Sequence, residues 1–357
     1  MPRLPAPLTL PDTDPGATRD GRARRARGKD PGRPAGGAGD RPPRTGRSPL
    51  RRGETVTAWA YISPAVLIIL GLSVVPVLWS LLLSFQADDL VTPSRWVGLD
   101  NYRALRQDPH FAEAVGNTLL YTALYVPLSI GLGLALGLAL NQRIRFVGLY
   151  RTLFFVPFVV SATAQGVLFS FILDPEFGVA NSVLHHLGIS SQGFLSDPGQ
   201  ALLVLVAISL WSGTGFCVVV FLAALQDVDP SLIEAARLDG AGRWHLLRHV
   251  TLPALAPVGV FLLVWQTINA LQVFDLVYVT TKGGPLGSTT VIVYFIWEQA
   301  FKNFTAGYGA AAAYVLALAL GVVTVGTRLV RSRSARQSPP TSQSPPTSQA
   351  SLEGAGK

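Results

Sequence analysis

Long apolar stretches without any Asp, Glu, Lys or Arg alternate with polar, charged segments along this chain. Six of the stretches are long enough to cross a hydrocarbon layer of about 30 Å, which requires about 20 helical residues. We expect helices, because lipid cannot satisfy the hydrogen bonds of an open strand edge. The six stretches are Ala58–Phe85, Val115–Leu140, Leu153–Leu173, Ala201–Leu225, Leu252–Phe274 and Gly307–Thr327.

The composition also points to a membrane protein. Of the 357 residues, 49% are hydrophobic and only 14% are charged, whereas soluble domains carry about 25% charged residues. A seventh apolar run, Val291–Trp297, is too short to span a bilayer. We expect it to lie at the outer surface or to enter the membrane part-way. The pattern therefore predicts an all-α membrane protein with six transmembrane helices.

The two ends of the chain are polar. Residues 1–55 are rich in Pro, Gly and Arg, and residues 331–357 are rich in Ser, Pro and Gln. Neither segment holds enough large apolar residues to offset the entropy lost on ordering, so we expect both to be disordered. A basic tail can bind nucleic acid. This one directly precedes an apolar span, which favours a solvated anchor beside membrane lipid, with no nucleic-acid partner.

Basic residues are distributed unevenly between the two sides of the predicted membrane. The N-terminal tail carries 13 of the 29 Lys and Arg, and three further segments on the same side raise that number to 24. These segments are the connection around Arg145, the segment 226–253 and the C-terminal end. Loops rich in Lys and Arg stay in the cytoplasm. Both termini and the segment 226–253 are therefore predicted to be cytoplasmic.

The segment 226–253 has the composition of two short helices joined by a turn. Pro230 can begin a helix with Asp229 or Ser231 as its N-cap, and Gly240 can end that helix in a left-handed conformation. The chain then restarts as a second helix that leads into the fifth apolar span. A helix-turn-helix projection of this kind is suited to being held by a partner protein.

The same segment resembles a known family. In order it contains Glu234-Ala235-Ala236, two residues, Asp239-Gly240-Ala241, eight residues, and Val250-Thr251-Leu252-Pro253. This order resembles the EAA coupling loop of binding-protein-dependent ABC importer permeases, with Leu247 and Val250 where Phe and Ile are common. Four further motifs are similar to sugar-type permeases, in particular the maltose-type first permease subunit. They are Gly98–Tyr102, Arg151–Pro157, Phe274–Asp275 and Gly283–Pro285.

The resemblance extends over about Trp59–Arg331 and implies the type I ABC importer permease fold. It implies a first transmembrane helix with an external loop at 56–114 and a type-1 transmembrane domain at 115–330. It further implies a subunit of the bacterial inner (cell) membrane that imports a sugar or sugar-like solute. Its partners would be a second homologous permease, an ATPase dimer and an external solute-binding protein. ATP and Mg²⁺ would be bound by the ATPase, so no cofactor is expected in this chain.

The resemblance also implies which residues couple to the ATPase. They are Glu234, Ala235, Ala236, Asp239, Gly240, Leu252 and Pro253. Glu234 would pair with a basic residue of the ATPase, and the alanines would keep the projection slim. Gly240 would permit the chain reversal, with Asp239 bracing the turn. Pro253 and the residue before it would join the loop rigidly to the fifth span.

A transported solute needs polar or aromatic groups on helix sides that face protein. The side chains expected to line its path are Ser209, Trp211, Gly213, Phe216, Trp265, Asn269, Gln272 and Asp275. Asn269, Gln272 and Asp275 are three residues apart and roughly follow one helix face. Trp rings can stack on sugar rings, while amides and carboxylates can hydrogen-bond hydroxyls. The same residues would equally serve interhelical hydrogen bonding and interfacial anchoring.

Motifs of enzymes are absent from the sequence. It contains no G-x-x-x-x-G-K-[ST], H-E-x-x-H or G-x-S-x-G pattern, and the lone Cys217 permits neither an intrachain disulfide nor a thiolate metal site. Gly133 and Gly137 lie in a charge-free span with no preceding strand, which favours close helix packing over nucleotide binding. We predict no enzymatic activity and no metal site. A self-sufficient secondary carrier or channel is the alternative, although its usual ionisable relay is missing from the spans.

Overall fold

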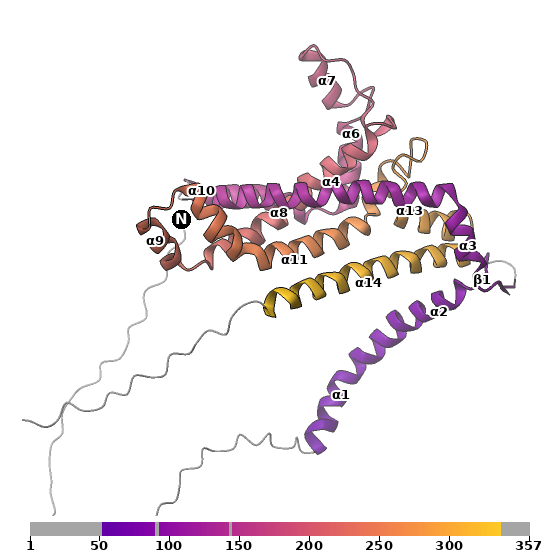
Figure 1. The fold of residues 1–357 in the computed structure, drawn as a ribbon. Coiled ribbons are helices and arrows are strands. Elements are labelled where there is room, and N and C mark those ends of the chain that lie inside the picture. Colours follow the sequence, from indigo (N-terminus) through magenta and orange to yellow (C-terminus); the bar gives the residue numbers. More distant parts are fainter. Residues whose placement is uncertain (1–51, 90–92, 143–144, 337–357) are drawn as a thin grey trace, which may run out of the picture. The chain divides into compact units, whose positions relative to one another are not determined.

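The computed structural model describes residues 52–89, 93–142 and 145–336 (Figure 1). The chain divides into two compact units, Met1–Ile62 and Ser63–Lys357, and the first is described only from residue 52. Most described residues are helical, as predicted. The α-helices are α1 (Arg52–Ile69), α2 (Val75–Leu83), α3 (Asp100–Gln107), α4 (Pro109–Leu140), α5 (Val147–Val159), α6 (Ala162–Ile172), α7 (Val179–His186), α8 (Ala201–Gln226), α9 (Pro230–Leu238), α10 (Arg243–Leu246), α11 (Leu252–Leu271), α12 (Asp275–Val279), α13 (Ile292–Trp297) and α14 (Ala306–Arg336).

Shorter elements complete the described part of the chain. Strands β1 (Gln86–Ala87) and β2 (Arg95–Trp96) pair in antiparallel fashion. Three π-helical turns are η1 (Leu70–Val74), η3 (Leu247–Thr251) and η4 (Glu298–Lys302), and one 3-10 turn is η2 (Phe194–Ser196). The π turn η1 ends two residues before Pro76, whose ring would clash with a carbonyl of the preceding turn in a regular α-helix.

Five helical segments in the described ranges are long and apolar enough to cross a membrane, and a bent pair of helices makes a sixth. The segments are Thr57–Leu83, Pro109–Leu140, Ala201–Gln226, Arg243–Val279 and Ala306–Gly326, with Val147–Val159 and Ala162–Ile172 as the bent pair. The prediction of six spans is confirmed when the bent pair is counted as one.

Helices overlap the inner ends of both predicted tails. Helix α1 begins at Arg52, inside the predicted tail 1–55, and α14 continues to Arg336, past the predicted start of the second tail at residue 331. Once a helix exists, each added residue gains a hydrogen bond at little further cost, and Arg is a good helix former. A membrane-spanning helix therefore extends by some residues beyond its apolar stretch. The remainder of both predicted tails lies outside the described residues.

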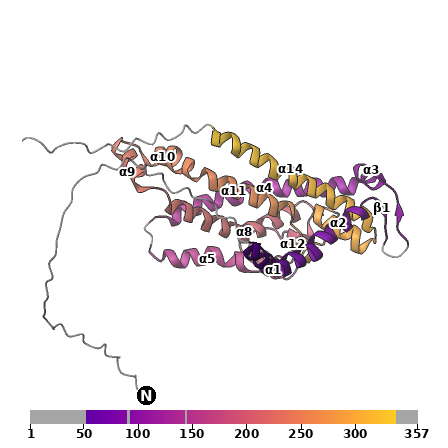
Figure 2. The same cartoon turned by 90° about the horizontal axis from the view of Figure 1, so that it is seen from below.

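Helices α4, α8 and α11 pack against one another in the unit Ser63–Lys357 (Figures 1 and 2). Two glycines allow α4 to approach α8 closely. A Cβ on Gly133 would stand 2.3 Å from the Cβ of Cys217, and one on Gly137 would stand 3.2 Å from the Cβ of Phe221. The predicted close packing at these two glycines is confirmed, and Cys217 is fully buried beneath it.

The third span is bent by 97°, although the sequence predicted one helix. Val160 is extended, and Ser161 begins α6 by accepting a hydrogen bond from the Ala164 N–H at 3.3 Å. The side-chain amide of Gln165 donates to the carbonyl oxygens of Pro157 at 3.1 Å and Val160 at 2.7 Å. Irregular backbone is tolerated in a membrane protein where other groups satisfy its hydrogen bonds. Gln165 therefore stabilises the break.

The short apolar run 291–297 forms α13, which packs against α4 and α14. The Asn117 side chain donates to the carbonyl oxygens of Gly287 at 3.0 Å and Thr290 at 3.1 Å. The Thr118 hydroxyl accepts a hydrogen bond from the Ile292 N–H at 2.8 Å. Side chains of α4 therefore satisfy the backbone hydrogen bonds of the segment that leads into α13. This run can be buried although it is too short to span a membrane. Its depth in the membrane stays a prediction.

The motif around Asn101 ties α2 to α3. The Asn101 side chain donates to the carbonyl oxygens of Ser84 and Gln86, each at 2.9 Å. The hydroxyls of Ser84 and Tyr102 share a hydrogen bond of 2.8 Å, and Gly98 adopts a positive φ of 60° at the turn before α3. The residues that carry this resemblance therefore have a structural role at the end of the first span.

Candidate functional site

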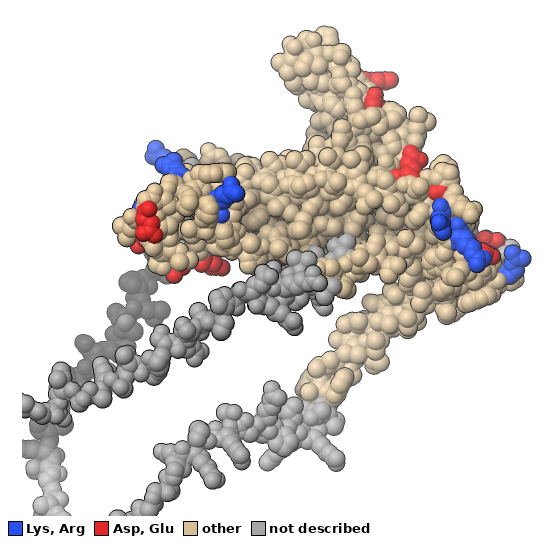
Figure 3. Space-filling model, viewed as in Figure 1, with Lys and Arg blue, Asp and Glu red and all other residues tan. Residues whose placement is uncertain are grey.

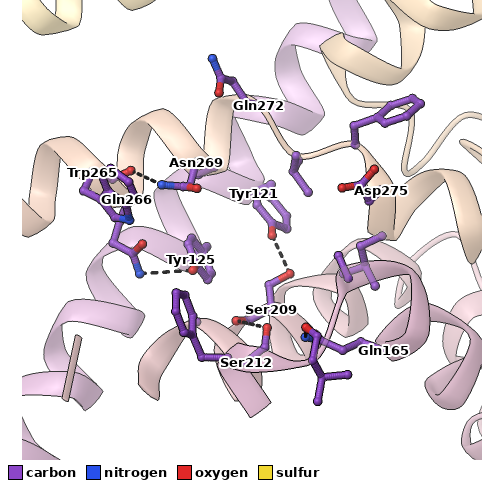
Figure 4. Close-up of a pocket in the computed structure, with 18 residues that line it drawn as sticks. Tyr121, Tyr125, Gln165, Ser209, Ser212, Trp265, Gln266, Asn269, Gln272 and Asp275 are labelled. Carbon is purple, nitrogen blue, oxygen red and sulfur yellow. Dashed lines mark hydrogen bonds between the residues drawn. The ribbon is translucent and has the colours of Figure 1, made fainter. Parts of the chain in front are cut away.

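A cavity of about 380 Å³ lies between α4, α6, α8 and α11 (Figure 4). Aromatic rings face it from Tyr121, Tyr125, Phe158, Trp265 and Phe274. Between the rings stand amides, hydroxyls and one carboxylate. Cavities of about 300–1,000 Å³ with mainly apolar walls and a few convergent polar groups are typical of small-molecule sites. The arrangement can therefore hold a small solute by ring contacts and hydrogen bonds.

Six of the eight positions that the sequence placed on the solute path line this cavity. They are Ser209, Gly213, Trp265, Asn269, Gln272 and Asp275. They come from α8, from α11 and from the residues that follow α11, which are the two spans named in the prediction. The predicted continuous helix face is interrupted, because α11 ends at Leu271 and Asp275 begins α12. Their contact with a solute stays a prediction.

The other two positions, Trp211 and Phe216, do not line the cavity. Trp211 packs edge-on against Phe169 of α6, with ring centroids 5.2 Å apart. Phe216 contacts two wall residues, Phe158 at 5.3 Å and Trp265 at 5.7 Å between ring centroids. Phe216 therefore supports the aromatic wall, and Trp211 links α8 to α6.

The sequence analysis missed two tyrosines of α4 that face the cavity. Tyr121 donates a hydrogen bond to the Ser209 hydroxyl at 2.7 Å, and its ring stacks on that of Tyr125 with centroids 5.7 Å apart. A signal for them was available. Tyr121, Tyr125 and Ser129 recur every four residues in an otherwise largely aliphatic span, which places them on one helix face.

Gln266 connects α11 to both neighbouring helices beside the cavity. Its Nε2 lies 3.2 Å from the Tyr125 hydroxyl, 3.3 Å from the Ser129 hydroxyl and 3.2 Å from the Cys217 sulfur. The Gln266 side chain is buried, and a buried amide without partners costs about 1–3 kcal/mol. This contact therefore holds α4, α8 and α11 together next to Trp265, the adjacent residue in the cavity wall.

The segment 226–253 forms two short helices, as predicted, and Asp229 caps the first. The Asp229 carboxylate accepts a hydrogen bond from the Ser231 N–H at 2.8 Å, and Pro230 occupies the first helical position. Hydrogen bonding from the Ser231 backbone lowers the pKa of the Asp229 carboxyl. Of the two predicted caps, the structure therefore selects Asp229.

Gly240 ends α9 in the predicted left-handed conformation, with φ of 83°. The Ala241 N–H bonds to the Ala236 carbonyl at 2.9 Å, and the Gly240 N–H bonds to the Arg237 carbonyl at 3.0 Å. This pair of bonds is a Schellman motif, which requires positive φ at the glycine position. No heavy atom lies within 4 Å of a Cβ built on Gly240. The glycine is therefore needed for its backbone conformation alone.

Helices α9 and α10 expose large apolar side chains beside polar ones. Leu238 is 89% exposed and Trp244 is 69% exposed. Glu234 is also exposed, and neither its carboxylate nor that of Asp239 has a bonded partner within the described ranges. The Asp239 backbone N–H bonds to the Ala235 carbonyl at 3.0 Å, as in a regular helix, and bracing of the turn by its side chain stays a prediction. Exposed apolar groups rimmed by polar ones are typical of protein-binding surfaces.

The second helix of the segment runs into the fifth span. Helix α10 continues through the π turn η3 into α11, and Pro253 stands in the first turn of α11. A proline ring in a regular helix would clash with the carbonyl four residues earlier, which here belongs to His249. The wider π turn accommodates that ring. A helical connection therefore extends from α10 to Trp265 in the cavity wall.

Comparison with known proteins identifies the family. Residues 129–334 match the family described as "Binding-protein-dependent transport system inner membrane component". The chain belongs to this family. The permease is 35% identical over 286 residues to the lactose transport system permease protein LacF of Rhizobium radiobacter, covering 78% of this chain and 95% of LacF. It is 33% identical over 287 residues to the sulfoquinovosyl glycerol transport system permease protein SmoG of Agrobacterium fabrum, covering 80% of this chain and 93% of SmoG.

A solved structure has the same fold. It is a chain of a bacterial alginate ABC transporter, crystallised with an alginate pentasaccharide-bound periplasmic protein. The TM-score is 0.71 and the identity 24%, over 80% of the permease and 96% of that chain. The predicted ABC importer permease fold is thereby confirmed. The permease is a multi-pass inner-membrane component of a transport system, and its family is one of transport proteins rather than enzymes.

Proposed function

We propose that this permease forms part of the path by which a sugar or sugar-like solute is imported across the inner membrane. The cavity between α4, α6, α8 and α11 is the observation that carries this proposal. Its aromatic rings can pack against the C–H faces of a sugar ring, while amides and hydroxyls can exchange hydrogen bonds with sugar hydroxyls. The relatives named for the transport of lactose and of sulfoquinovosyl glycerol support the same class of solute.

ATP hydrolysis by a separate ATPase dimer drives transport in this proposal, and the segment 226–253 is the contact with that dimer. Exposed Leu238 and Trp244 would enter a cleft of the ATPase, and Glu234 would pair with a basic residue there. ATP and Mg²⁺ are held by the ATPase. When the ATPase closes, the segment moves, and the helical connection α10–η3–α11 tilts Trp265 and Asn269 in the cavity wall. The cavity would thus open alternately to each side.

The proposal includes two further partners and a topology. A second, homologous permease completes the path, and an external solute-binding protein delivers the solute. The periplasmic protein in the alginate transporter structure supports the latter partner. Both termini and the segment 226–253 lie in the cytoplasm, in agreement with the excess of Lys and Arg on that side. Residues 115–330 form the transport domain, preceded by the first helix and its external loop at 56–114.

Reconstitution tests this function directly. The permease is purified with its co-isolating subunits, placed in proteoliposomes and assayed for uptake of labelled saccharides with ATP and the solute-binding protein. We expect ATP-dependent uptake by the complete complex and none by the permease alone. Glu234→Arg should lower solute-stimulated ATP hydrolysis by about tenfold or more, because it places like charges together at the ATPase contact. Glu176→Arg, in the connection between α6 and α7, is the matched control and should leave hydrolysis unchanged.

A labelling experiment tests the topology separately. Glu234→Cys should react with a membrane-impermeant thiol reagent only when the cytoplasmic side is accessible. The native Cys217 is buried and provides a low background. Reaction from the outside, or uptake by the purified permease without an ATPase, would contradict the proposed function and favour a self-sufficient carrier.

A further inference from the structure

We propose that a pocket at the base of the segment 226–253 binds the headgroup of an anionic phospholipid from the adjoining leaflet of the membrane. The site is separate from the cavity between α4, α6, α8 and α11, and it requires neither a solute nor ATP. The segment would thus contact lipid in addition to its proposed contact with the ATPase.

The pocket has a volume of about 410 Å³ and lies between the end of α4, helix α9 and the connection α10–η3. Two apolar helices have their ends here, because α4 ends at Leu140 and α11 begins at Leu252. The lining residues Leu138 and Gln142 flank the first of these ends, and Thr251 directly precedes the second. The headgroup region of a bilayer borders the ends of the apolar spans. The pocket therefore lies at the depth of the phospholipid phosphates.

The formal charges of the pocket are all positive. Arg237 and Arg243 line it, and no Asp or Glu is among its lining residues. Both arginines are exposed, and neither has an ion-pair partner among the residues that the structure describes. In the view of Figure 3, Lys and Arg gather near α9–α10 and near α3, away from the middle of the bundle. Two unpaired guanidinium groups at one pocket attract an anion, and each can bind a phosphate through two parallel hydrogen bonds.

On α9, the pocket and the surface proposed for the ATPase lie on different faces. Ile233 and Arg237 are four residues apart, so they share one helix face, and both line the pocket. Glu234 and Leu238 follow them by one residue each, which turns their face by about 100°. Neither Glu234 nor Leu238 lines the pocket. Contact of α9 with the ATPase therefore leaves the pocket face available to lipid.

The connection α10–η3 shows the same separation. Arg243 and Leu247 are four residues apart and line the pocket. Trp244 and Arg248 are also four residues apart, and neither of them lines it. Arg248 is exposed on the helix side of Trp244, which the proposed function assigns to the ATPase. The chain thus offers a second arginine position, next to the pocket and outside it, for a matched control.

Apolar side chains decide which anion suits the pocket. A free phosphate ion has no apolar part, whereas the acyl chains of a phospholipid can cover aliphatic side chains beside the headgroup. A phosphatidylcholine has no net charge, and its ammonium group would face the same arginines. An anionic phospholipid satisfies both the charge and the apolar wall. The aliphatic lining residues are Leu138, Ile233, Leu246 and Leu247.

Photo-crosslinking in the complete transporter complex tests the site, in proteoliposomes without solute or ATP. The probes are a phosphatidylglycerol and a phosphatidylcholine with the same acyl chains and the same photoreactive group beside the glycerol backbone. Mass spectrometry of peptides locates the crosslinks. Phosphatidylglycerol should label the peptides at the end of α4 and in α10–η3 about fivefold more than phosphatidylcholine, or better. The basic N-terminal tail also attracts anionic lipid, so only crosslinks in these peptides are counted.

Substitutions of the two arginines measure their share. Arg237→Gln and Arg243→Gln should each lower this labelling by about fivefold, and together by about tenfold or more. The double replacement by Lys keeps the charge and should stay within about threefold of the wild type. Arg248→Gln removes the same charge outside the pocket and should leave the labelling unchanged. All variants are compared at equal amounts of assembled complex with similar thermal unfolding temperatures, so that misfolding is recognised.

Four results would overturn the inference. They are equal labelling by both probes, unchanged labelling in the double Gln variant, the same loss in Arg248→Gln, and labelling that occurs in the permease alone and is lost in the complete complex. The last result would assign the pocket to the ATPase. Suppression of the labelling by inorganic phosphate at constant ionic strength would assign it to a free anion and equally overturn a lipid site. Because the test uses neither solute nor ATP, its result does not depend on the proposed transport function.

Discussion

The Tyr125 hydroxyl of α4 fills the space beside Gly213 of α8, where an added Cβ would stand only 2.1 Å from the hydroxyl oxygen. The same hydroxyl accepts a hydrogen bond from Gln266 of α11 at 3.2 Å. Helices α4, α8 and α11 therefore contact one another at one buried tyrosine. This contact is possible because residue 213 has no side chain. The cavity wall depends on this arrangement, because Tyr125, Gly213 and Gln266 all line it.

We predict that Gly213→Ala displaces Tyr125 and weakens its bond to Gln266. Overpacking of this kind typically costs about 1–3 kcal/mol, which thermal unfolding of the purified permease would detect. Saccharide binding should weaken as well, because the aromatic wall moves. Gly259→Ala is the control, since no heavy atom lies within 4 Å of a Cβ built there. Equal effects of the two substitutions would contradict the prediction.

Gly133→Ala should be more damaging than Gly213→Ala. Its Cβ would stand 2.3 Å from the Cβ of Cys217, an atom that cannot move without moving the backbone of α8. A tyrosine hydroxyl, in contrast, lies at the end of a side chain that can rotate. We expect a lower unfolding temperature and reduced assembly with partner subunits. Gly131→Ala on the same helix meets no atom within 4 Å and should be tolerated.

Substitution of Gly240 tests the coupling of the segment 226–253 to the ATPase without a change in packing, because a Cβ at this position would contact no other atom. A residue with a Cβ in the left-handed conformation loses about 1–2 kcal/mol, and a β-branched one is the least compatible. Gly240→Val should therefore abolish solute-stimulated ATP hydrolysis in the assembled complex, whereas Gly240→Asn should retain most of it, because Asn tolerates this conformation. Gly242→Ala, at a glycine with negative φ and open surroundings, is the control. Unchanged coupling in Gly240→Val would refute the role of the turn.

The order of α9 should depend on pH through Asp229. Its pKa lies below the usual value of 3.8, because its carboxylate accepts the Ser231 N–H bond. The stabilisation by this cap is thus fully present above pH of about 4 and is lost as the pH falls through the lowered pKa. A spin label on α9 should therefore become more mobile at acidic pH in the wild type. Asp229→Asn, which keeps a capping oxygen without a titrating group, should remove this transition.

Local properties of the chain explain which features could be predicted from its sequence. The spans follow from the length of charge-free stretches, and the end of α9 follows from a glycine placed where positive φ is required. The close packing of α4 and α8 follows from Gly133 and Gly137, whose spacing leaves one helix face without side chains. The bend of the third span was missed because Gln165, which satisfies the freed carbonyl oxygens, resembles any other polar residue in a helix.

The sequence by itself determined the membrane-spanning helices, the helix-turn-helix of residues 226–253 and most of the polar positions on spans four and five. Only the tertiary structure decided that Tyr121 and Tyr125 face the same cavity and that Phe216 stands behind its wall. It also decided that Asp275 is the one charged side chain among the described residues that line the cavity. The physical reason is that a spanning helix is apolar on all sides, so its hydrophobic pattern does not show which face meets a neighbour. That choice depends on packing between segments far apart in the chain.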